Sequence, residues 1–582
     1  MTIDRIRKLL GEIYGGERAN ELADRLADRC TRAGKTPPAR QYQIESSSFD
    51  ETSAVLITYA DILAPADARE APGDKHPDTP ADTPLDVLAS FLRERVAGLF
   101  SHLHILPFFP WTSDDGFSVA DYSKPDPRYG TWADIEALGA DFSLAFDLVL
   151  NHGSAQSQWF RDFLAGDPRR KNWYLTRPEG WKGPQVVRPR TSPLLTEFSL
   201  GAGRAVHVWT TFSDDQVDFD WSNPDVLLAF VDILLMYMVH GCELLRLDAI
   251  AYLWKEDGTP CIHHPKTHAM VKLFRALIDA FHLPITLLTE TNVPHEENVS
   301  YFGAGDEAHM VYNFPLPPLT LHAAVSGDAG PLRDWARTLE YPEHGIFLNF
   351  LASHDGIGLT PAKGLVDEAA FAATLERCVE RGALISTKAT PQGPIPYELN
   401  SAWLSAVAPP GLGLAHHRAR AFLATHAVLL ALRGVPAIWF HSLFGGENWV
   451  EGPEVRGYKR AINREKPGRV ELEARLADPA GLPALVFAGL EKLLTFRAAH
   501  PAFAPASPQR VIESAGAVFA LVRGPDAEGE YVLCAMNLGP WPAAVEYVDE
   551  TISMIHLSLE PWQTRWVPFT ADGLLREDEL CT

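Results

Sequence analysis

Acidic residues stand at the ends of three separate apolar runs of the sequence. Asp248 ends the run ELLRLD, Glu290 follows ITLLT, and Asp355 follows IFLNFLASH. Arg246 lies two positions before Asp248, a spacing that puts both side chains on one face of a strand. Carboxylates that share a site can divide the roles of ionised group and proton donor between them. The types and positions of these residues therefore favour a catalytic site.

Two histidines accompany these acids in the same kind of position. His152 follows the run AFDLVLN, and His354 directly precedes Asp355. Taken alone, an Arg-Leu-Asp motif is most often a structural ion pair, and an acid at a strand end is often merely solvated. The combination, repeated at the ends of several apolar runs, favours a single site over these structural explanations.

Short runs rich in leucine and β-branched residues predict the strands that would position these side chains. They lie at 55–59, 103–107, 145–150, 243–247, 285–289, 309–314, 346–352 and 436–440. Helical stretches separate them: Ser222-Asn223-Pro224 predicts one helix start, and Gly241 ends that helix directly before the next strand. This alternation predicts a parallel α/β sheet, and eight strands predict a closed (β/α)8 TIM barrel with its active site at the carboxyl ends of the strands. An open doubly wound sheet would show the same alternation, but no GxGxxG motif follows the first strand.

The chain is longer than one core usually supports, so several domains are expected. Two stretches are too long for simple loops and predict inserted subdomains after strands three and seven. Near the end of the chain the pattern changes to strands only, which predicts an antiparallel β domain. A surface loop is predicted at 63–84. The predicted division is an N-terminal helical extension at 1–52, barrel segments at 53–152, 221–358 and 419–500, inserted subdomains at 153–220 and 359–418, and a C-terminal β domain at 501–582.

The composition limits the class of partner. A formal net charge of −24 without a long Lys/Arg run argues against nucleic acid or an anionic membrane surface. The N-terminus lacks the apolar core of a signal peptide, and the apolar run 226–239 contains Asp232 and is too short to span a bilayer. Six scattered cysteines without a CxxC pair predict free thiols. We expect a cytoplasmic protein that binds a small molecule, and the oligomeric state stays open.

At its polar strand ends the sequence resembles the α-amylase superfamily (glycoside hydrolase family 13). The motifs that carry the resemblance are DLVLNH (147–152), RLDA (246–249), TETN (289–292) and SHD (353–355). The resemblance implies that Asp248 is the nucleophile, that Glu290 is the general acid/base, and that Asp355 is a third carboxylate holding sugar hydroxyls.

The resemblance also implies that Arg246 orients Asp248 and that His152 and His354 bind the same glucosyl ring. Retaining glycosyl transfer needs one ionised carboxylate at the anomeric carbon and one protonated carboxyl at the leaving oxygen, about 5–5.5 Å apart. Arg246 is expected to lower the pKa of Asp248, whereas Glu290 needs a less solvated setting that raises its pKa.

Further motifs resemble the sucrose phosphorylase subfamily. They are LITYAD (56–61), HILPFFPW (104–111), DDGFSVADY (114–122), RPR (188–190), TFSDDQVD (211–218), NFPLPPLTLHA (313–323) and SHDGIG (353–358). This resemblance implies that Asp114 and Arg464 bind the glucosyl ring, and that Arg190 lies on a loop linked to phosphate and acceptor recognition. The remaining residues that we expect at the substrate are Phe117, Gln216, Tyr252 and Glu398.

Within this subfamily, the wording of several motifs is most similar to that of the glucosylglycerate phosphorylases. These motifs are THAMVKLFRALID (267–279), TETNVPHEEN (289–298), YFGAGDEAHMVY (301–312), FLASHDGIGL (350–359) and PYELN (396–400). Sucrose phosphorylases have Gln where this chain has Glu398, which argues against a fructose acceptor. Glycerate and phosphate are both anions, so each would need Arg190, with Arg188 or Lys388 nearby, to offset the negative net charge.

No metal or organic cofactor is expected, and inorganic phosphate would be a co-substrate. Amylases often bind calcium partly through the residue four after the nucleophile, and here that residue is Tyr252, which is a poor calcium ligand. One cysteine and three histidines between 261 and 268 resemble a zinc cluster, but Pro265 interrupts them and no pair has secure ligand spacing.

The expected activity is therefore phosphorolysis of 2-O-α-glucosylglycerate by double displacement. Sucrose phosphorolysis is the first alternative, and hydrolysis or transglucosidation is the second. A dependence of turnover on phosphate would separate these classes. An inert amylase-like scaffold would be expected to lack one of the three carboxylates, and all three are present.

Overall fold

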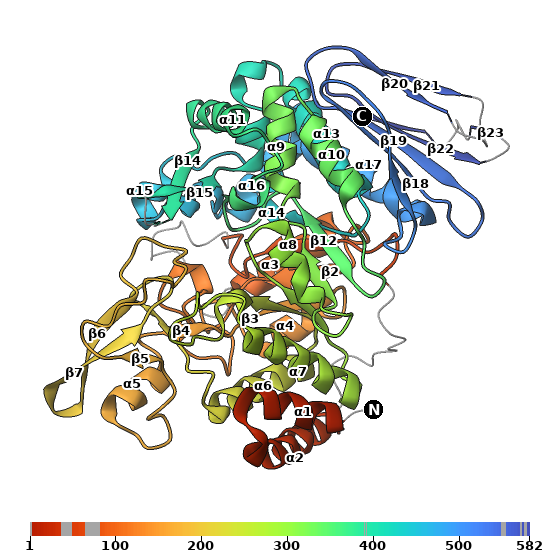
Figure 1. Ribbon diagram of the computed structural model, residues 1–582. Coiled ribbons are helices and arrows are strands. Elements are labelled where there is room, and N and C mark those ends of the chain that lie inside the picture. The colour runs from red at the N-terminus through yellow and green to blue at the C-terminus, as the bar shows by residue number, and fades with distance from the viewer. Residues whose placement is uncertain are drawn as a thin grey trace.

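The computed structural model of the protein describes residues 3–35, 49–64, 82–388, 390, 393–548, 554–570, 573–574 and 579–582. Most of the predicted surface loop at 63–84 lies outside the described residues. The chain is arranged around a central barrel, with the C-terminal strands on one side and an inserted subdomain on the other (Figure 1).

Eight parallel strands close the central barrel, and they are the eight strands that the apolar runs predict. Each pairs with its two neighbours in the order β1-β2-β3-β9-β10-β11-β12-β16 and back to β1. Their bounds are Val55–Thr58, His102–Ile105, Ser143–Val149, Cys242–Asp248, Thr286–Thr289, Met310–Tyr312, Ile346–Phe350 and Val435–Trp439. The predicted barrel fold is confirmed.

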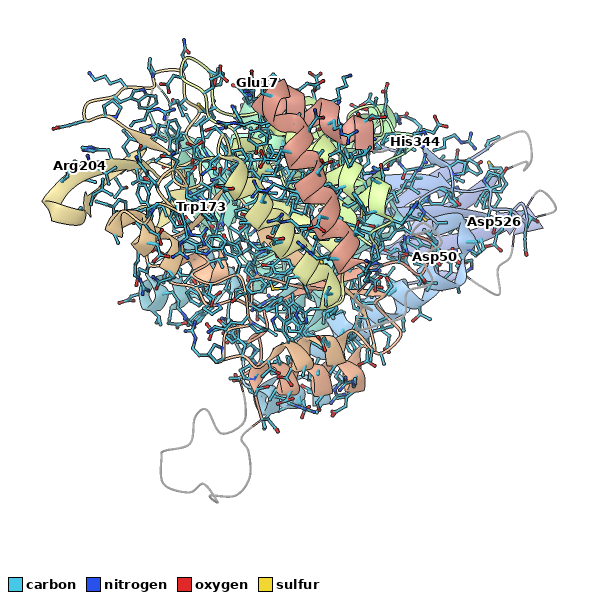
Figure 2. All side chains as sticks on the ribbon, turned by 90° about the horizontal axis from the view of Figure 1, so that it is seen from below. Glu17, Asp50, Trp173, Arg204, His344 and Asp526 are labelled. Atoms are coloured by element: carbon cyan, nitrogen blue, oxygen red, sulfur yellow. The ribbon has the colours of Figure 1, made fainter. Side chains whose placement is uncertain are left out.

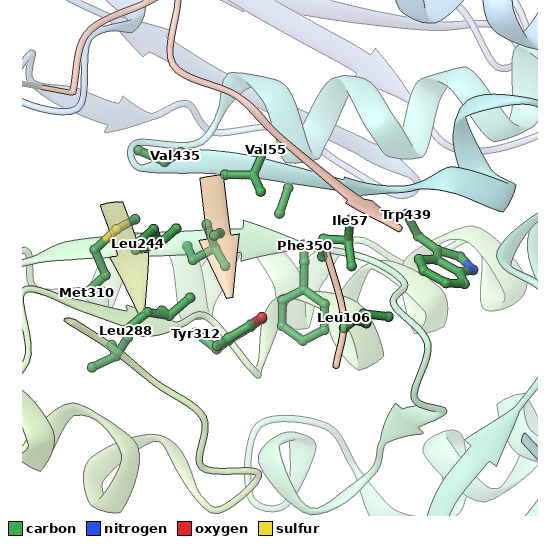
Figure 3. Packing of buried hydrophobic residues seen from close by; sticks show 14 of the residues in the cluster. Val55, Ile57, Leu106, Leu244, Leu288, Met310, Tyr312, Phe350, Val435 and Trp439 are labelled. Carbon is green, nitrogen blue, oxygen red and sulfur yellow. The ribbon is translucent and has the colours of Figure 1, made fainter. Parts of the chain in front are cut away.

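The interior of the barrel is a packed core. Figure 3 shows side chains from β1, β9, β10, β11, β12 and β16 meeting there, among them Val55, Leu244, Leu288 and Met310, and each of these four is at most 2% exposed. Leu245 and Leu247 alternate with the inward residues of β9 and are fully buried beneath the surrounding helices. Strands buried on both faces explain why the sequence reads as nearly continuous apolar runs.

Helices surround the barrel. The helix before β9 begins at the predicted cap, where the Asn223 side chain accepts a hydrogen bond from the Asp225 N–H, and Gly241 follows its end with φ of 96°. Among the described residues no single helix has the length and hydropathy to cross a membrane, although α16 and α17, bent by 80° at their break, meet the criterion as a pair. The helices outside the two insertions and the N-terminal pair are α3 (Pro84–Arg95), α4 (Trp132–Leu138), α6 (Pro224–Val239), α7 (Pro265–Phe281), α8 (His295–Val299), α9 (Leu316–Ser326), α10 (Gly330–Thr338), α13 (Ala415–Ala431), α14 (Phe440–Leu443), α15 (Gly452–Arg456), α16 (Arg469–Ala477) and α17 (Leu482–Ala499).

Two insertions extend from the carboxyl ends of barrel strands. The first follows β3 and holds a three-stranded sheet, β5-β7-β6, and a two-stranded ladder, β4-β8. The second follows β12 and holds the antiparallel sheet β13-β15-β14 beside α11. Their elements are β4 (His152–Ser154), α5 (Gln158–Ala165), β5 (Thr176–Arg177), β6 (Leu195–Leu200), β7 (Arg204–Trp209) and β8 (Gln216–Asp218), then β13 (Ile357–Gly358), α11 (Glu368–Glu380), β14 (Leu384–Lys388), β15 (Ile395–Asn400) and α12 (Trp403–Val407).

The N-terminal helices α1 (Ile3–Tyr14) and α2 (Gly16–Ala33) form a hairpin that packs on α7 and α6 (Figure 2). Their inward residues, including Leu10 and Leu26, are fully buried. Arg29 of α2 forms an ion pair of 2.9 Å with Asp232 of α6. This pair explains the single acid within the apolar run of α6.

The end of the chain forms the predicted antiparallel β domain. One sheet has the order β17-β18-β19-β22-β23, with β24 paired to β22, and β20 and β21 form a separate ladder. The bounds are β17 (Gln509–Val511), β18 (Val518–Arg523), β19 (Tyr531–Asn537), β20 (Ala543–Tyr547), β21 (Ile555–Leu559), β22 (Thr564–Thr570), β23 (Gly573–Leu574) and β24 (Leu580–Cys581).

Candidate active site

Strands β3 and β9 bring a buried charge network to the barrel lumen. Their register places Asp147 opposite Arg246. The Arg246 guanidinium donates hydrogen bonds to Asp147 and, at 2.8 Å, to Asp248 Oδ1. His104 of β2 lies 2.7 Å from the other Asp147 oxygen. Because Arg246 is held from both sides and only 2% exposed, it fixes the carboxylate of Asp248 at the end of β9.

The three acids at the strand ends line one cavity. We call this space the catalytic cavity. Of the other predicted site residues, eight also line it: Asp114, Phe117, His152, Arg190, Gln216, Arg246, Tyr252 and His354. Arg464 and Glu398 do not line it. The residues of its wall that the sequence analysis did not single out include Phe212, Asn292, Tyr312, Tyr397 and Arg460.

A strained turn directly after Asp248 contacts Glu290. Ala249, the residue after Asp248, has φ of 49°, a left-handed conformation that costs a residue with a side chain about 1–2 kcal/mol. In this conformation its N–H donates a hydrogen bond of 3.1 Å to Glu290 Oε2. The turn therefore holds the second carboxyl beside the first.

Burial governs the protonation of these two acids. It raises the pKa of Glu290 above its usual range, against the opposing charge of Arg246. It also raises the pKa of Asp248. Arg246 lowers that pKa, as expected, but burial and the nearby carboxylates outweigh the guanidinium, so the pKa of Asp248 lies above its usual range. Of the two carboxyls, only Asp248 is hydrogen-bonded to Arg246. When Asp248 and Glu290 together carry one negative charge, that charge is therefore best stabilised on Asp248, and the remaining proton stays on Glu290.

The third acid, Asp355, belongs to a different network. Arg460 forms an ion pair with Asp355 and donates two hydrogen bonds, of 2.8 and 2.7 Å, to the carboxylate of Glu398. Burial alone would raise the pKa of both acids, but Arg460 holds each below its usual range. Both acids are therefore ionised at neutral pH.

Glu398 lies behind the cavity wall. It is 1% exposed, and besides Arg460 it accepts a hydrogen bond of 2.9 Å from the Gly356 N–H. A side chain at position 356 would meet it, since a Cβ atom there would lie 2.4 Å from Glu398 Oε1. The structure thus places Glu398 as a support of the Asp355 loop.

Arg464 also lies behind the wall. It donates hydrogen bonds of 2.7 Å to the His354 carbonyl and 3.0 Å to Asp115, while Asp114 is 3.7 Å away. Burial opposes ionisation of Asp115, yet Arg464 holds the pKa of Asp115 below its usual range. Asp114 faces the cavity, and its ion-paired neighbour Asp115 anchors the turn.

The two histidines are neutral and firmly placed. Burial lowers the pKa of both His152 and His354. His152 Nε2 lies 3.0 Å from the Phe117 carbonyl and 3.1 Å from the Gln216 amide nitrogen. The Phe117 ring stacks on His354, with centroids 4.8 Å apart and planes within 3°. Together these groups form a polar edge and a flat aromatic face suited to a sugar ring.

Arg190 is the cation of the cavity wall without a carboxylate partner. Its guanidinium lies 5.9 Å from the centroid of Phe212 and 5.8 Å from that of Tyr397, and it forms no ion pair with any described residue. Lys388 and Arg188 are not in this wall; they line an adjoining cavity. Arg190 is therefore the group best placed to receive an anion.

The histidines near 263 have individual partners. His263 lies 3.0 Å from the Tyr301 hydroxyl, His264 caps α7, and His268 lies 2.8 Å from Glu307. Within the described part of the chain, no three His, Cys, Asp or Glu side chains form a group that could hold a metal ion. Tyr252 lines the catalytic cavity and packs edge-on against Phe212.

Sequence comparison adds to this geometry. The family described as alpha amylase, catalytic domain, matches residues 99–355. The chain is 48% identical to the glucosylglycerate phosphorylase of Spirochaeta thermophila, over 92% of this chain and 89% of that protein. The chain belongs to the α-amylase family, in its branch of glucosylglycerate and sucrose phosphorylases.

Other members of the family agree with this placement. The glucosylglycerate phosphorylase of Escherichia coli is 39% identical over 97% of this chain and 99% of its own. A sucrose phosphorylase of Bifidobacterium adolescentis is 29% identical over 77% of this chain and 85% of its own. The crystal structure of sucrose 6F-phosphate phosphorylase from Thermoanaerobacter thermosaccharolyticum has the same fold, with a TM-score of 0.73 at 24% identity, covering 88% of this chain and 99% of that one.

Proposed function

We propose that the protein is a retaining glycoside phosphorylase that converts 2-O-α-glucosylglycerate and phosphate into α-glucose 1-phosphate and glycerate. The convergence of Asp248, Glu290 and Asp355 on one cavity carries the glycoside chemistry. The choice of donor and of phosphate rests on the glucosylglycerate phosphorylases that match nearly the whole chain at 39–48% identity.

The first half of the reaction forms a glucosyl ester. Asp248 attacks the anomeric carbon as the bond to the glycerate oxygen breaks, and Glu290 donates its proton to that oxygen. The roles follow from the contacts: Arg246 stabilises negative charge on Asp248, and burial keeps the proton on Glu290. Asp355, held ionised by Arg460, accepts hydrogen bonds from sugar hydroxyls.

In the second half, phosphate replaces glycerate. A phosphate oxygen attacks the anomeric carbon, Glu290 takes up the phosphate proton, and the carboxylate of Asp248 is released. Arg190 forms no ion pair with a carboxylate in the described part of the chain, so it is the residue that we assign to the anion, either phosphate or the carboxylate of glycerate.

Sucrose phosphorolysis is less well supported. The sucrose phosphorylases that match are 27–29% identical to this chain. Glu398 stands where those enzymes are expected to have Gln, and its carboxylate is already engaged by Arg460 and the Gly356 N–H. It is therefore not free to bind a fructosyl group.

We further propose that no metal is required and that the protein works in the cytoplasm. The described residues offer no metal-binding group, and all six cysteines have free thiols. Dialysis against EDTA is expected to leave the rate of phosphorolysis unchanged. A loss of activity that calcium or another divalent ion restores would contradict this.

The central experiment measures release of α-glucose 1-phosphate from glucosylglycerate, sucrose and glucosylglycerol, each with and without phosphate. We expect product from glucosylglycerate only when phosphate is present, and a much lower rate from sucrose. Equal consumption of glucosylglycerate without phosphate would make the enzyme a hydrolase and would refute the proposal.

A further inference from the structure

A second, larger cavity adjoins the catalytic cavity. Its volume is about 920 Å³, compared with about 90 Å³ for the catalytic cavity. The two spaces share the lining residues Tyr252, Asn292, Val293 and Tyr397. We call the larger space the acceptor chamber, because it opens from the wall that carries Glu290 and its neighbours Thr291 and Asn292.

The walls of the acceptor chamber are mainly apolar. They come from the first insertion, from the loop that follows β9, and from the second insertion, where α11 and β15 contribute. Typical members are Val187, Ile262, Leu359, Phe371 and Leu375. Such a surface favours an apolar group over a hydrated ion.

Polar groups gather where the acceptor chamber meets the catalytic cavity. Tyr397 has Arg190 on its ring at 5.8 Å and Lys388 at 5.3 Å. The Asn292 amide oxygen is buried and has no hydrogen-bond partner among the described residues. The junction therefore offers cations for a carboxylate and an acceptor for a hydroxyl. The space beyond is mainly apolar, with Arg188, Lys363 and Glu368 among its other lining residues.

Glycerate is a small, fully polar anion and has no apolar group that could fill this space. The chamber beyond is large enough for a whole aromatic ring, since cavities of 300–1,000 Å³ hold complete small ligands.

We infer that the enzyme also glucosylates larger 2-hydroxy carboxylates, with their apolar substituent in the acceptor chamber. The inference rests on the proposed function, because it uses the same glucosyl ester. The bond between the anomeric carbon and the phosphate of α-glucose 1-phosphate breaks as the ester to Asp248 forms, and Glu290 donates its proton to the departing phosphate oxygen. The 2-hydroxyl oxygen then attacks that carbon, its proton passes to Glu290, and the Asp248 carboxylate is released.

The test compares three acceptors with α-glucose 1-phosphate as donor: glycerate, lactate and 3-phenyllactate. Lactate and 3-phenyllactate share the 2-hydroxy acid and differ by the phenyl group alone. We expect kcat/KM for 3-phenyllactate to exceed that for lactate by about tenfold or more, measured as phosphate release and glucoside formation.

Two tryptophan variants on α11 locate the phenyl group. Ala372 and Ala373 are both exposed, but only Ala372 lines the acceptor chamber. Ala372→Trp is expected to lower kcat/KM for 3-phenyllactate at least tenfold while the value for glycerate changes less than twofold. Ala373→Trp, the matched control, is expected to leave both unchanged.

Turnover of glycerate without any glucosylation of 3-phenyllactate would overturn the inference and leave the proposed function standing. Equal effects of the two variants on 3-phenyllactate would also overturn it, because the substituent would then lie elsewhere. If glucosylglycerate itself released no glucose 1-phosphate with phosphate present, the proposed function would fail first, and the inference with it.

Discussion

Arg246 gives Asp248 and Glu290 different roles in the reaction. Burial raises the pKa of both Asp248 and Glu290, so burial alone would leave neither of them a nucleophile. The hydrogen bond of 2.8 Å from Arg246 reaches only Asp248. That single contact turns two similar acids into an attacking group and a proton donor.

Replacing the nucleophile tests this division. Asp248→Asn keeps the size of the side chain and removes the attacking charge, so we expect the rate of phosphorolysis to fall about 10⁴-fold. The thermal unfolding transition, followed by circular dichroism, should still show a folded protein. Activity near that of the unmodified enzyme would show that another residue forms the ester.

Arg460 and Glu398 are expected to shift the pH profile in opposite directions. Arg460 lowers the pKa of Glu290, and Glu398 partly neutralises Arg460. Arg460→Gln should raise the pKa of Glu290 and move the alkaline limb of kcat/KM to higher pH, with a loss in rate of about 10²-fold. Glu398→Gln should lower that pKa and move the limb to lower pH.

If Arg460 and Glu398 had a purely structural role, both variants would lose activity, but the alkaline limb of kcat/KM would stay at the same pH in each. The pH profile of kcat/KM between about pH 4 and 9 is therefore the deciding measurement. If the alkaline limb moved in the same direction in both variants, the result would contradict the assigned charges.

At the scale of elements, β15 connects the second insertion to the barrel. The strand carries Tyr397, which faces the catalytic cavity, and Glu398, which supports the Asp355 loop through the Gly356 N–H. Gly356 is required there because a Cβ atom would lie 2.4 Å from Glu398.

Gly356→Ala is therefore expected to displace Glu398 and to lower both activity and stability, the latter by about 1–3 kcal/mol. Gly411→Ala in the same insertion is the matched control, since a Cβ atom there has nothing within 4 Å. Urea unfolding and the rate of phosphorolysis check both. Equal behaviour of the two variants would show that the Glu398 contact is not needed.

The elements that the sequence predicts best are the buried ones. Barrel strands lie between lumen and helices, so they appear as apolar runs, and the acids that end them stand out. Arg460 could not be selected in the same way. Arg460 lies in a 3-10 helix at Lys459–Asn463, and Arg464 directly follows it. The sequence alone does not say which of the two arginines faces the cavity.

Tyr397 and Phe212 were not predicted, for a related reason. They come from insertions whose short strands have no strong periodicity, so their side-chain directions follow from tertiary packing. Arg190 was identified through its motif, whereas its lack of an ion partner became visible only in the structure. The sequence shows the Arg246 guanidinium, which lowers the pKa of Asp248, but it does not show the burial, which raises that pKa above its usual range.

For the whole molecule, the N-terminal hairpin is a stabilising layer remote from the site. It packs on α6 and α7, outside the barrel, and contributes no residue to the catalytic cavity. Leu10→Ala, which removes a fully buried side chain of α1, is expected to reduce the free energy of unfolding by about 3 kcal/mol. Glu12→Ala on the exposed face should change it by less than about 0.5 kcal/mol.

The KM for glucosylglycerate should be unchanged in both variants while they remain folded. Denaturation by urea and steady-state kinetics at 25 °C provide the two measurements. A marked rise in KM for Leu10→Ala alone would show that the hairpin reaches the substrate through the barrel helices.

Tyr397 and Glu398 are consecutive residues of β15, so a movement of this strand shifts both side chains. The Tyr397 ring lines both cavities, and the Glu398 carboxylate accepts hydrogen bonds from Arg460 and from the Gly356 N–H. A movement of β15 that displaced the Tyr397 ring would therefore also displace Glu398 and weaken the hold of Arg460 on Asp355. The shared wall of the two cavities and the ionised state of Asp355 therefore depend on the position of the same strand.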